Sequence, residues 1–188
     1  MKQKKSYRLL GIDPGTNILG YAVIEVVNKK LNPLDIGVIK MNHLKEHQLK
    51  LKKIFERIQT IIEVYNPREM AIEAPFYAKN VQSMLKLGRA QGVSIAAAIT
   101  QGVEVTEYSP KKIKQSVTGN GNASKEQVAA MLQNIMDFEL GDHYLDATDA
   151  LATAVCHYYQ SSSLLGSMKK YGGWDSFIKE NPDRLSSR

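Results

Sequence analysis

The chain has 188 residues, of which 43% are hydrophobic and 23% are charged, a composition typical of one ordinary globular domain. Its formal net charge of +6 favours a polyanionic partner over an acidic protein partner, although basic residues can also serve solubility alone. A single cysteine, Cys156, excludes an intrachain disulfide, and no apolar run is long enough for a membrane span. We therefore expect a cytoplasmic protein that does not use a membrane.

The predicted elements begin with three strands that are close enough in sequence to form an antiparallel meander, at residues 7–13, 18–27 and 31–41. Two further strands are predicted at 69–73 and 103–108. Helices follow from apolar residues at helical spacing, over 44–65, 80–101, 110–118, 124–137 and 145–160. Because helical crossovers precede the later strands, those strands should run parallel to the first. The expected fold class is α/β, with a mixed five-stranded sheet flanked by helices.

The composition changes near the end of the chain. Residues 1–160 read as one domain, whereas the sequence after Ser161-Ser162-Ser163 is polar and rich in glycine. Within 161–188, Trp174, Phe177 and Ile178 recur at helical spacing. We expect this segment to be an appendage that is partly flexible or forms a short docked helix.

Two predicted strands end in an acid. In "RLLGIDPGTNILGY" (8–21), Asp13 closes an apolar run just before a Pro-Gly turn, and Glu73 closes "EMAIE" (69–73). A buried carboxylate costs several kcal/mol unless a cation, a metal or hydrogen bonds compensate it. If the two strands are parallel neighbours, both acids lie at the sheet edge where α/β folds bind ligands. The simpler alternatives are that Asp13 initiates a turn and that Glu73 is a solvated strand end.

A second pair of acids stands in "YLDATDALATAV" (144–155). Asp146 and Asp149 are three residues apart at the start of a predicted helix, so they share a face. Acids are also common at helix N-termini for electrostatic reasons alone. Four carboxylates meeting at one place would repel one another, and hard divalent cations such as Mg²⁺ relieve that repulsion. Two such ions can clamp the attacking and leaving oxygens of a phosphoryl displacement.

Four blocks of sequence, in order over about residues 8–160, resemble the bacterial RuvC Holliday-junction resolvases: "GIDPGTNILGYAVIE" (11–25), "AIEAPFYAKNVQSMLKLGRAQGV" (71–93), "EYSPKKIKQSVTGNGNASKEQV" (107–128) and "DATDALATAVCH" (146–157). The resemblance implies an RNase H-like fold and a homodimer that resolves four-way DNA junctions during recombination and repair. It implies two symmetric nicks that depend on Mg²⁺, with two ions per active site and Mn²⁺ able to substitute. Branch-migration proteins of the RuvA and RuvB type are the implied partners.

Residue by residue, the resemblance carries the family's acidic tetrad onto Asp13, Glu73, Asp146 and Asp149. It carries the junction-contacting aromatic onto Phe76, and the functional lysines onto Lys114 and Lys125. An aromatic in a loop beside an acidic site can stack on an unpaired base, or it can fold back onto its own domain. Together with Lys111 and Lys112, the two lysines bracket the "GNGNAS" loop (119–124) and suit phosphate binding, although Lys111 and Lys112 also fit an ordinary solvated face.

Two other features leave alternatives open. Gly88, Gly92 and Ala96 recur every four residues, which suits either packing on the protein's own core or a dimer seam, and the resemblance favours the seam. His157 is expected to be a packing or surface residue rather than a metal ligand.

Three other functions compete with junction cutting. An actin-like ATPase also has an Asp-containing turn after its first strand, but it needs a second phosphate loop and two lobes, for which 188 residues leave no room. A different RNase H-like nuclease could act on RNA–DNA hybrids. A junction-binding module without activity is the third alternative, and the intact tetrad argues against it.

Overall fold

The computed structural model describes residues 6–75, 80–138 and 147–166. In these segments the strands are β1 (Ser6–Asp13), β2 (Ile18–Val27), β3 (Lys30–Lys40), β4 (Glu69–Glu73) and β5 (Glu104–Tyr108). The helices are α1 (His47–Tyr65), α2 (Val81–Ile99), α3 (Pro110–Thr118), α4 (Lys125–Met136) and α5 (Thr148–Gly166). Every predicted strand and helix is present, with small differences at the ends.

One five-stranded sheet runs through the molecule in the order β3-β2-β1-β4-β5. The β1–β2 and β2–β3 pairs are antiparallel, and the β1–β4 and β4–β5 pairs are parallel. This confirms the predicted meander followed by parallel strands. β1 lies at the centre of the sheet, with a hydrogen-bonded strand on each side, and this agrees with its apolar sequence.

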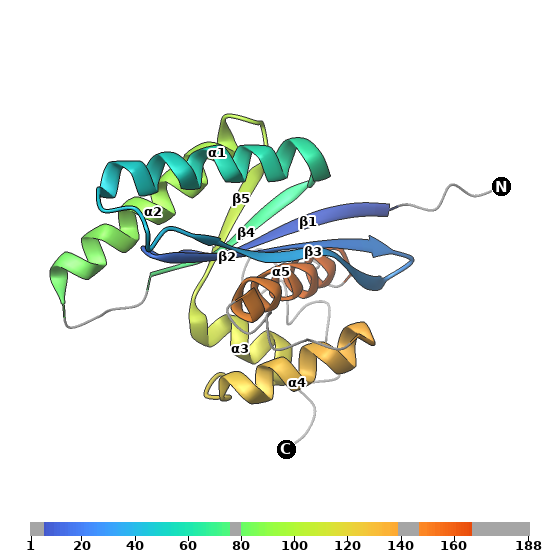
Figure 1. Ribbon diagram of the computed structural model, residues 1–188. Helices are drawn as coiled ribbons and strands as arrows, with labels where there is room; N and C mark the ends of the chain where they lie inside the picture. The colour runs from blue at the N-terminus through green and yellow to red at the C-terminus, as the bar shows by residue number, and fades with distance from the viewer. Residues whose placement is uncertain (1–5, 76–79, 139–146, 167–188) are drawn as a thin grey trace, which may run out of the picture.

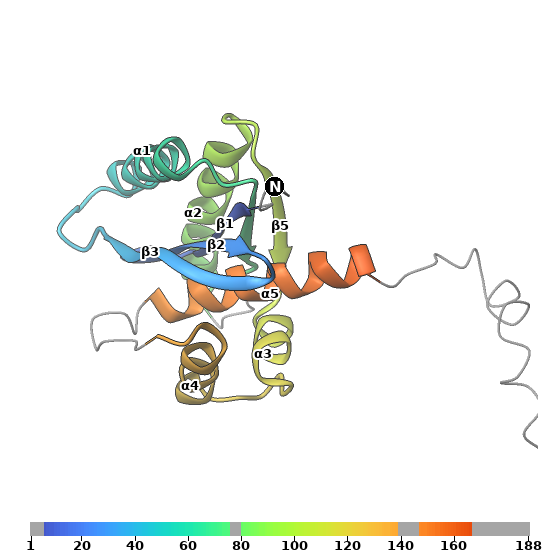
Figure 2. The same ribbon diagram turned by 90° about the vertical axis from the view of Figure 1, so that its right-hand side faces the viewer.

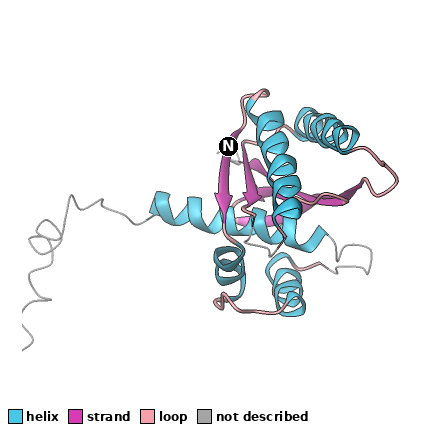
Figure 3. Cartoon of the chain, turned by 90° about the vertical axis from the view of Figure 1, so that its left-hand side faces the viewer, coloured by secondary structure: helices cyan, strands magenta, loops and turns pink. Residues whose placement is uncertain are grey.

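Helices cover both faces of the sheet (Figures 1 and 2). α1 and α2 pack side by side on one face, as the view in Figure 3 also shows, and α5 crosses the other face with α3 and α4 beyond it. Alternate residues of β1 divide between the two cores, because successive side chains of a strand point to opposite faces. Leu10 and Ile12 pack with α1 and α2, whereas Leu9 packs with α3, α4 and α5.

The start of α1 and the end of α5 differ clearly from the prediction. α1 begins at His47 rather than at residue 44, and it ends as predicted at Asn66, which adopts a left-handed conformation and closes the last turn onto Ile62. α5 continues to Gly166, six residues beyond the predicted end. The serines do not break it, because the hydroxyls of Ser161 and Ser162 donate to backbone carbonyls one turn earlier. None of the helices in the described segments has the combination of length and hydrophobicity that a membrane span requires.

Candidate active site

Asp13 and Glu73 lie next to each other at one edge of the sheet. β1 and β4 run parallel with Ile12 opposite Ile72, so the next residue on each strand is an acid. Both strands end at these acids. The carboxyl ends of the two central parallel strands therefore present two carboxylates side by side, as the sequence predicted.

The strand alternation also decides which face the two side chains occupy. On β1, Asp13 has the same parity as Leu9, whose side chain packs against α5. On β4, Glu73 has the opposite parity from Met70 and Ile72, which pack with α1 and α2. Both carboxylates consequently belong to the face of the sheet that α5 covers.

α5 brings a third carboxylate to the same place. Asp149 stands in the first turn of α5, and this helix packs closely on β1. The contact requires Gly11, because a Cβ on this residue would lie 2.1 Å from the carbonyl oxygen of Ala150 and 2.8 Å from the backbone nitrogen of Ala154. The role of Gly11 goes beyond the sequence predictions, although a glycine inside a buried strand is a known signal of close backbone approach.

The three acids influence one another electrostatically. Burial raises the pKa of Asp13 to about 6, with a further rise from Asp149 and a smaller opposing effect of Lys125. Burial raises the pKa of Glu73 to about 7, and the charges of Asp13 and Asp149 add to this rise. Both shifts mean that the protein by itself disfavours the ionised forms. The carboxylates therefore form a site that a cation would stabilise.

A lysine already supplies part of this positive charge. Lys125 is the first residue of α4, which begins with a capping box formed by Ser124 and Gln127. Its ammonium lies 2.5 Å from Oδ2 of Asp149, and the hydrogen bond to Asp149 is the main reason that the pKa of Lys125 is raised. The structure thus brings Lys125 to the acidic cluster.

Lys114 has a different position. Its ammonium donates a hydrogen bond of 2.8 Å to the carbonyl oxygen of Ala123, so it ties α3 to the start of α4 across the 119–124 loop. It is still close enough to the site to oppose the raised pKa of Glu73, after the larger effects of burial and of the two aspartates. Lys111 and Lys112 are exposed on the first turn of α3.

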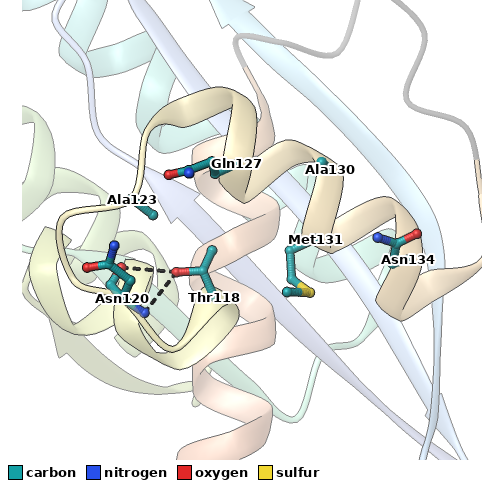
Figure 4. A pocket seen from close by; sticks show the side chains of 7 residues that line it. All are labelled: Thr118, Asn120, Ala123, Gln127, Ala130, Met131 and Asn134. Carbon is teal, nitrogen blue, oxygen red and sulfur yellow. Dashed lines mark hydrogen bonds between the residues drawn. The ribbon is translucent and has the colours of Figure 1, made fainter.

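Beside this loop, α3, α4 and the loop itself line an open pocket of about 320 Å³. Figure 4 shows Gln127, Met131 and Asn134 of α4 on one side and Thr118 and Asn120 on the other. The hydroxyl of Thr118 bonds to the backbone of Asn120 and holds the loop closed. Uncharged side chains line the pocket, so it does not extend the positive charge of Lys114 and Lys125.

Two predicted site residues, Asp146 and Phe76, lie outside the described residues. Within the described segments, no group of three or more His, Cys, Asp and Glu side chains by itself forms a metal site. The donors nevertheless suit a hard divalent cation, because Asp13, Glu73 and Asp149 offer only oxygen ligands. Burial, and after it the repulsion among these acids, raises the pKa values of Asp13 and Glu73.

His157 is fully enclosed, away from the acidic cluster. Its Nδ1 lies 2.9 Å from the Tyr108 hydroxyl and its Nε2 lies 2.6 Å from Oε2 of Glu69. It is 3% exposed, which agrees with the predicted packing role. The histidine joins α5 to β4 and β5, and its position gives it no access to a ligand at the carboxylates.

The domain has the α/β RNase H-like fold. This fold is defined by the sheet order, by the crossovers and by the helix that lies across the central strands, and acids stand at the ends of the central parallel strands. The profile of the family "Crossover junction endodeoxyribonuclease RuvC" matches residues 9–157. With a match of this extent, the chain belongs to the RuvC family of crossover junction endodeoxyribonucleases.

Individual relatives agree with this assignment. The chain is 59% identical to the RuvC protein of Cytophaga hutchinsonii over 95% of its own length and 88% of the relative's. It is 52% identical to the RuvC protein of Bacteroides fragilis, over 94% and 95% of the two chains. Among solved structures, "T. thermophilus RuvC in complex with Holliday junction substrate" superposes with a TM-score of 0.75 at 30% identity, covering 82% of this chain and 94% of the other.

Proposed function

We propose that this protein resolves four-way (Holliday) DNA junctions by paired symmetric nicks during homologous recombination and DNA repair. The observation that carries the proposal is the meeting of Asp13, Glu73 and Asp149 from β1, β4 and α5, with Lys125 in contact with Asp149. Family membership supports the reaction, and the Thermus thermophilus relative, whose solved complex contains a Holliday junction substrate, supports the type of DNA.

Asp13, Glu73, Asp146 and Asp149 would hold Mg²⁺, two ions per active site, with Mn²⁺ able to substitute. The bound metal would polarise a phosphodiester and activate water for hydrolysis. The chain's own contribution is to keep these acids together at the end of the sheet. Lys125 holds Asp149 in place and offsets negative charge where the DNA backbone must approach.

The remaining predicted residues would bind DNA around this centre. Lys114, Lys111 and Lys112 on α3 would contact phosphates, and the two exposed lysines are the freer of the three to do so. Phe76 would stack on an unpaired base. These contacts position the junction and do not themselves cut it.

We propose a homodimer formed through α2, because two nicks on opposing strands need two active sites. The support is an apolar stripe along α2 that points away from its buried side, on which Ala90, Ser94 and Ala97 face the core. Val81, Leu85 and Ile99 of this stripe are 67%, 50% and 61% exposed. A Cβ on Gly88 or Gly92 would meet nothing within 4 Å, so the predicted core-packing alternative for these glycines is not supported.

The wider assignments follow from the same reaction. Branch-migration proteins of the RuvA and RuvB type are the proposed partners, because they act on the same junctions. Residues 1–160 are the proposed nuclease domain and 161–188 the appendage, although α5 extends into the latter.

One experiment tests the proposal against its alternatives. The pure protein is incubated with a mobile four-way junction, a linear duplex and an RNA–DNA hybrid, with and without Mg²⁺. We expect paired nicks in the junction only, and only with metal. Preferential cutting of the hybrid would support the other RNase H-like activity, and binding of the junction without cutting would support an inactive module.

A further inference from the structure

A second group of basic residues surrounds a pocket at the same end of the sheet. This pocket, of about 210 Å³, lies between the β1–β2 turn and the N-terminal parts of α1 and α2. Thr16 and Asn17 of the turn form part of its wall. The rest is largely basic: Lys45, His47, Lys50 and Lys86. Figure 1 shows the turn and the two helix N-termini at one end of the molecule.

The ionisable side chains that line this pocket are all basic. Burial lowers the pKa of His47, and the neighbouring charges that lower it further, Arg89, Lys86 and Lys50, are all cations. None of the described residues forms an ion pair with Lys45 or Lys86. Like charges held this close repel one another, so the pocket is electrostatically prepared for an anion.

Two further observations point to a ligand. Nε2 of His47 is buried, and it is the one buried side-chain nitrogen or oxygen in the described segments that lacks a hydrogen-bond partner. Such a group costs free energy until it is paired. In addition, the Lys50 ammonium is fixed by a hydrogen bond of 2.6 Å to Oδ1 of Asn17, which leaves two of its three protons for another acceptor.

The size of the pocket limits what this ligand is. A volume of 210 Å³ is about seven times the share of one liquid water, which accommodates a phosphate group and its first waters. It is below the ~300–1,000 Å³ usual for pockets that enclose whole small molecules. The chemical class that fits is therefore a single phosphate or phosphodiester group.

The pocket lies close to the carboxylates but on the opposite face of the sheet. Asn17 is four residues after Asp13, so their Cα atoms are at most about 14 Å apart. Asp13 and Glu73 face α5, whereas the pocket is formed by α1 and α2. A DNA strand bound between Lys125 and this pocket would pass directly across the carboxylates.

We propose that Lys45, His47, Lys50 and Lys86 bind a backbone phosphate of the DNA strand that is cut, on the side of the carboxylates opposite Lys114 and Lys125. This inference rests on the proposed function, because that function supplies the strand. With one phosphate per about 3.4 Å of each strand, the bound phosphate lies within roughly four nucleotides of the scissile one. A ligand oxygen in the pocket, with a rotation of the His47 ring, gives Nε2 its missing partner.

The first test measures junction affinity by fluorescence anisotropy over a salt series, without divalent metal so that no strand is cut. Lys45→Ala and Lys86→Ala should each reduce the slope of log affinity against log salt by about one unit, and the double variant by about two. The matched control is Lys52→Ala, which removes the same charge from an exposed site on α1. An unchanged slope in the double variant, or equal flattening by Lys52→Ala, overturns the proposal.

The second test does not depend on junction cutting. The ¹⁵N signals of the His47 ring, assigned by their loss in His47→Gln, are followed in the full chain on addition of inorganic phosphate or a short linear DNA strand. We expect the strand to shift them, and the Lys45→Ala/Lys86→Ala variant to lose the shift. A response to inorganic phosphate but not to DNA identifies a free-anion site and overturns the proposal. The absence of any response to either ligand overturns it as well. If the protein ignores four-way junctions but His47 responds to the strand, the proposed function fails and the phosphate site stands.

Discussion

The ammonium of Lys125 lies 2.5 Å from Oδ2 of Asp149, and this ion pair joins the first turn of α4 to the first turn of α5. Asp149 is partly buried while Lys125 is exposed, so the lysine reaches inward from solvent. Among the described cations it most strongly opposes the raised pKa values of Asp13 and Glu73. A metal ion that binds Asp149 would therefore share this carboxylate with the Lys125 ammonium.

Replacing Lys125 should separate its effect on metal binding from its effect on cutting. In Lys125→Met, the half-saturating Mg²⁺ concentration should fall, because a competing positive charge is removed. The cutting rate at saturating Mg²⁺ should fall as well, because Asp149 and the approaching backbone lose a charged partner. Junction-nicking rates over a Mg²⁺ titration measure both quantities.

Lys52→Met is the matched control for this prediction, because it removes the charge of an exposed lysine on α1 whose ion pair among the described residues is with Glu56 of the same helix. It should leave both quantities unchanged. A Lys125→Met protein with unchanged metal dependence and unchanged rate would show that the ion pair has no functional role.

The raised pKa values of Asp13 and Glu73 predict how stability depends on pH. Both acids bind protons more tightly in the folded than in the unfolded chain, where their ordinary values are 3.8 and 4.5. From about pH 4 to pH 7 the folded state holds more protons, so the free energy of unfolding falls as the pH rises through this window. Asp13→Asn should therefore stabilise the metal-free protein by about 3 kcal/mol at pH 8.

Urea unfolding at pH 4 and pH 8 measures this effect. At pH 4 the variant and the parent should differ little, because Asp13 is then largely protonated in the folded state. Saturating Mg²⁺ should stabilise the parent and not the variant, which reverses their order at pH 8. A variant that is less stable than the parent at pH 8 without metal would contradict the burial argument.

The same acids should be needed for cutting and not for binding. Asp13→Asn and Glu73→Gln keep the size of each side chain while removing its charge. We expect nicking to be abolished and junction affinity to be largely retained, because affinity depends on phosphate contacts elsewhere. Gel assays of binding and nicking on one junction measure both, and full cleavage in Mg²⁺ by either variant would remove that acid from the catalytic site.

The convergence of Asp13 and Glu73 could be predicted from the sequence because it depends on local patterns. Each acid ends an apolar strand, and the crossover rule makes those strands parallel. The 2.5 Å contact of Lys125 with Asp149 could not be predicted, since it depends on the angle at which α4 meets α5. The basic pocket at His47 was missed for a similar reason, because its residues come from a turn and two helix N-termini that are separated in sequence.

Gly11 should be needed for both stability and activity. A methyl group in Gly11→Ala meets the backbone of α5 at Ala150 and Ala154, which cannot move aside as a side chain can. We expect a loss of about 1–3 kcal/mol in unfolding free energy. We also expect a fall in cutting rate at a temperature where the variant is fully folded, because α5 carries Asp149.

Ile58→Ala is the control for Gly11→Ala. Ile58 is fully buried between α1 and the opposite face of the sheet, and its truncation should cost about 2–5 kcal/mol. Because this core does not contact α5, the cutting rate of the folded variant should stay close to that of the parent. If the two variants lose activity in proportion to stability alone, Gly11 has no special role in placing Asp149.

The proposed dimer seam can be tested with one charge. Leu85→Glu places a carboxylate on the exposed apolar stripe of α2, and burying it against a second copy would be costly. Sedimentation should show a monomer at micromolar concentration where the parent is a dimer. Val64→Glu alters an apolar residue of α1 that is even more exposed, and it should leave the dimer intact. A dimer that tolerates Leu85→Glu would place the seam elsewhere.

Lys114, Lys111 and Phe76 should affect the junction through three different physical effects. Lys111→Ala removes an exposed charge and should flatten the salt dependence of junction affinity by about one unit. Lys114→Ala also breaks the bond to the Ala123 carbonyl, so it should lower the unfolding free energy by about 1 kcal/mol in addition. Phe76→Ala should leave the salt dependence nearly unchanged and reduce cutting, because a stacked base is worth about 1–3 kcal/mol and carries no charge. Affinity and cutting rate over one salt series, with urea unfolding of each variant, separate these three effects. Phe76 does not act by stacking if Phe76→Ala cuts normally. The same holds if Phe76→Ala flattens the salt dependence as Lys111→Ala does.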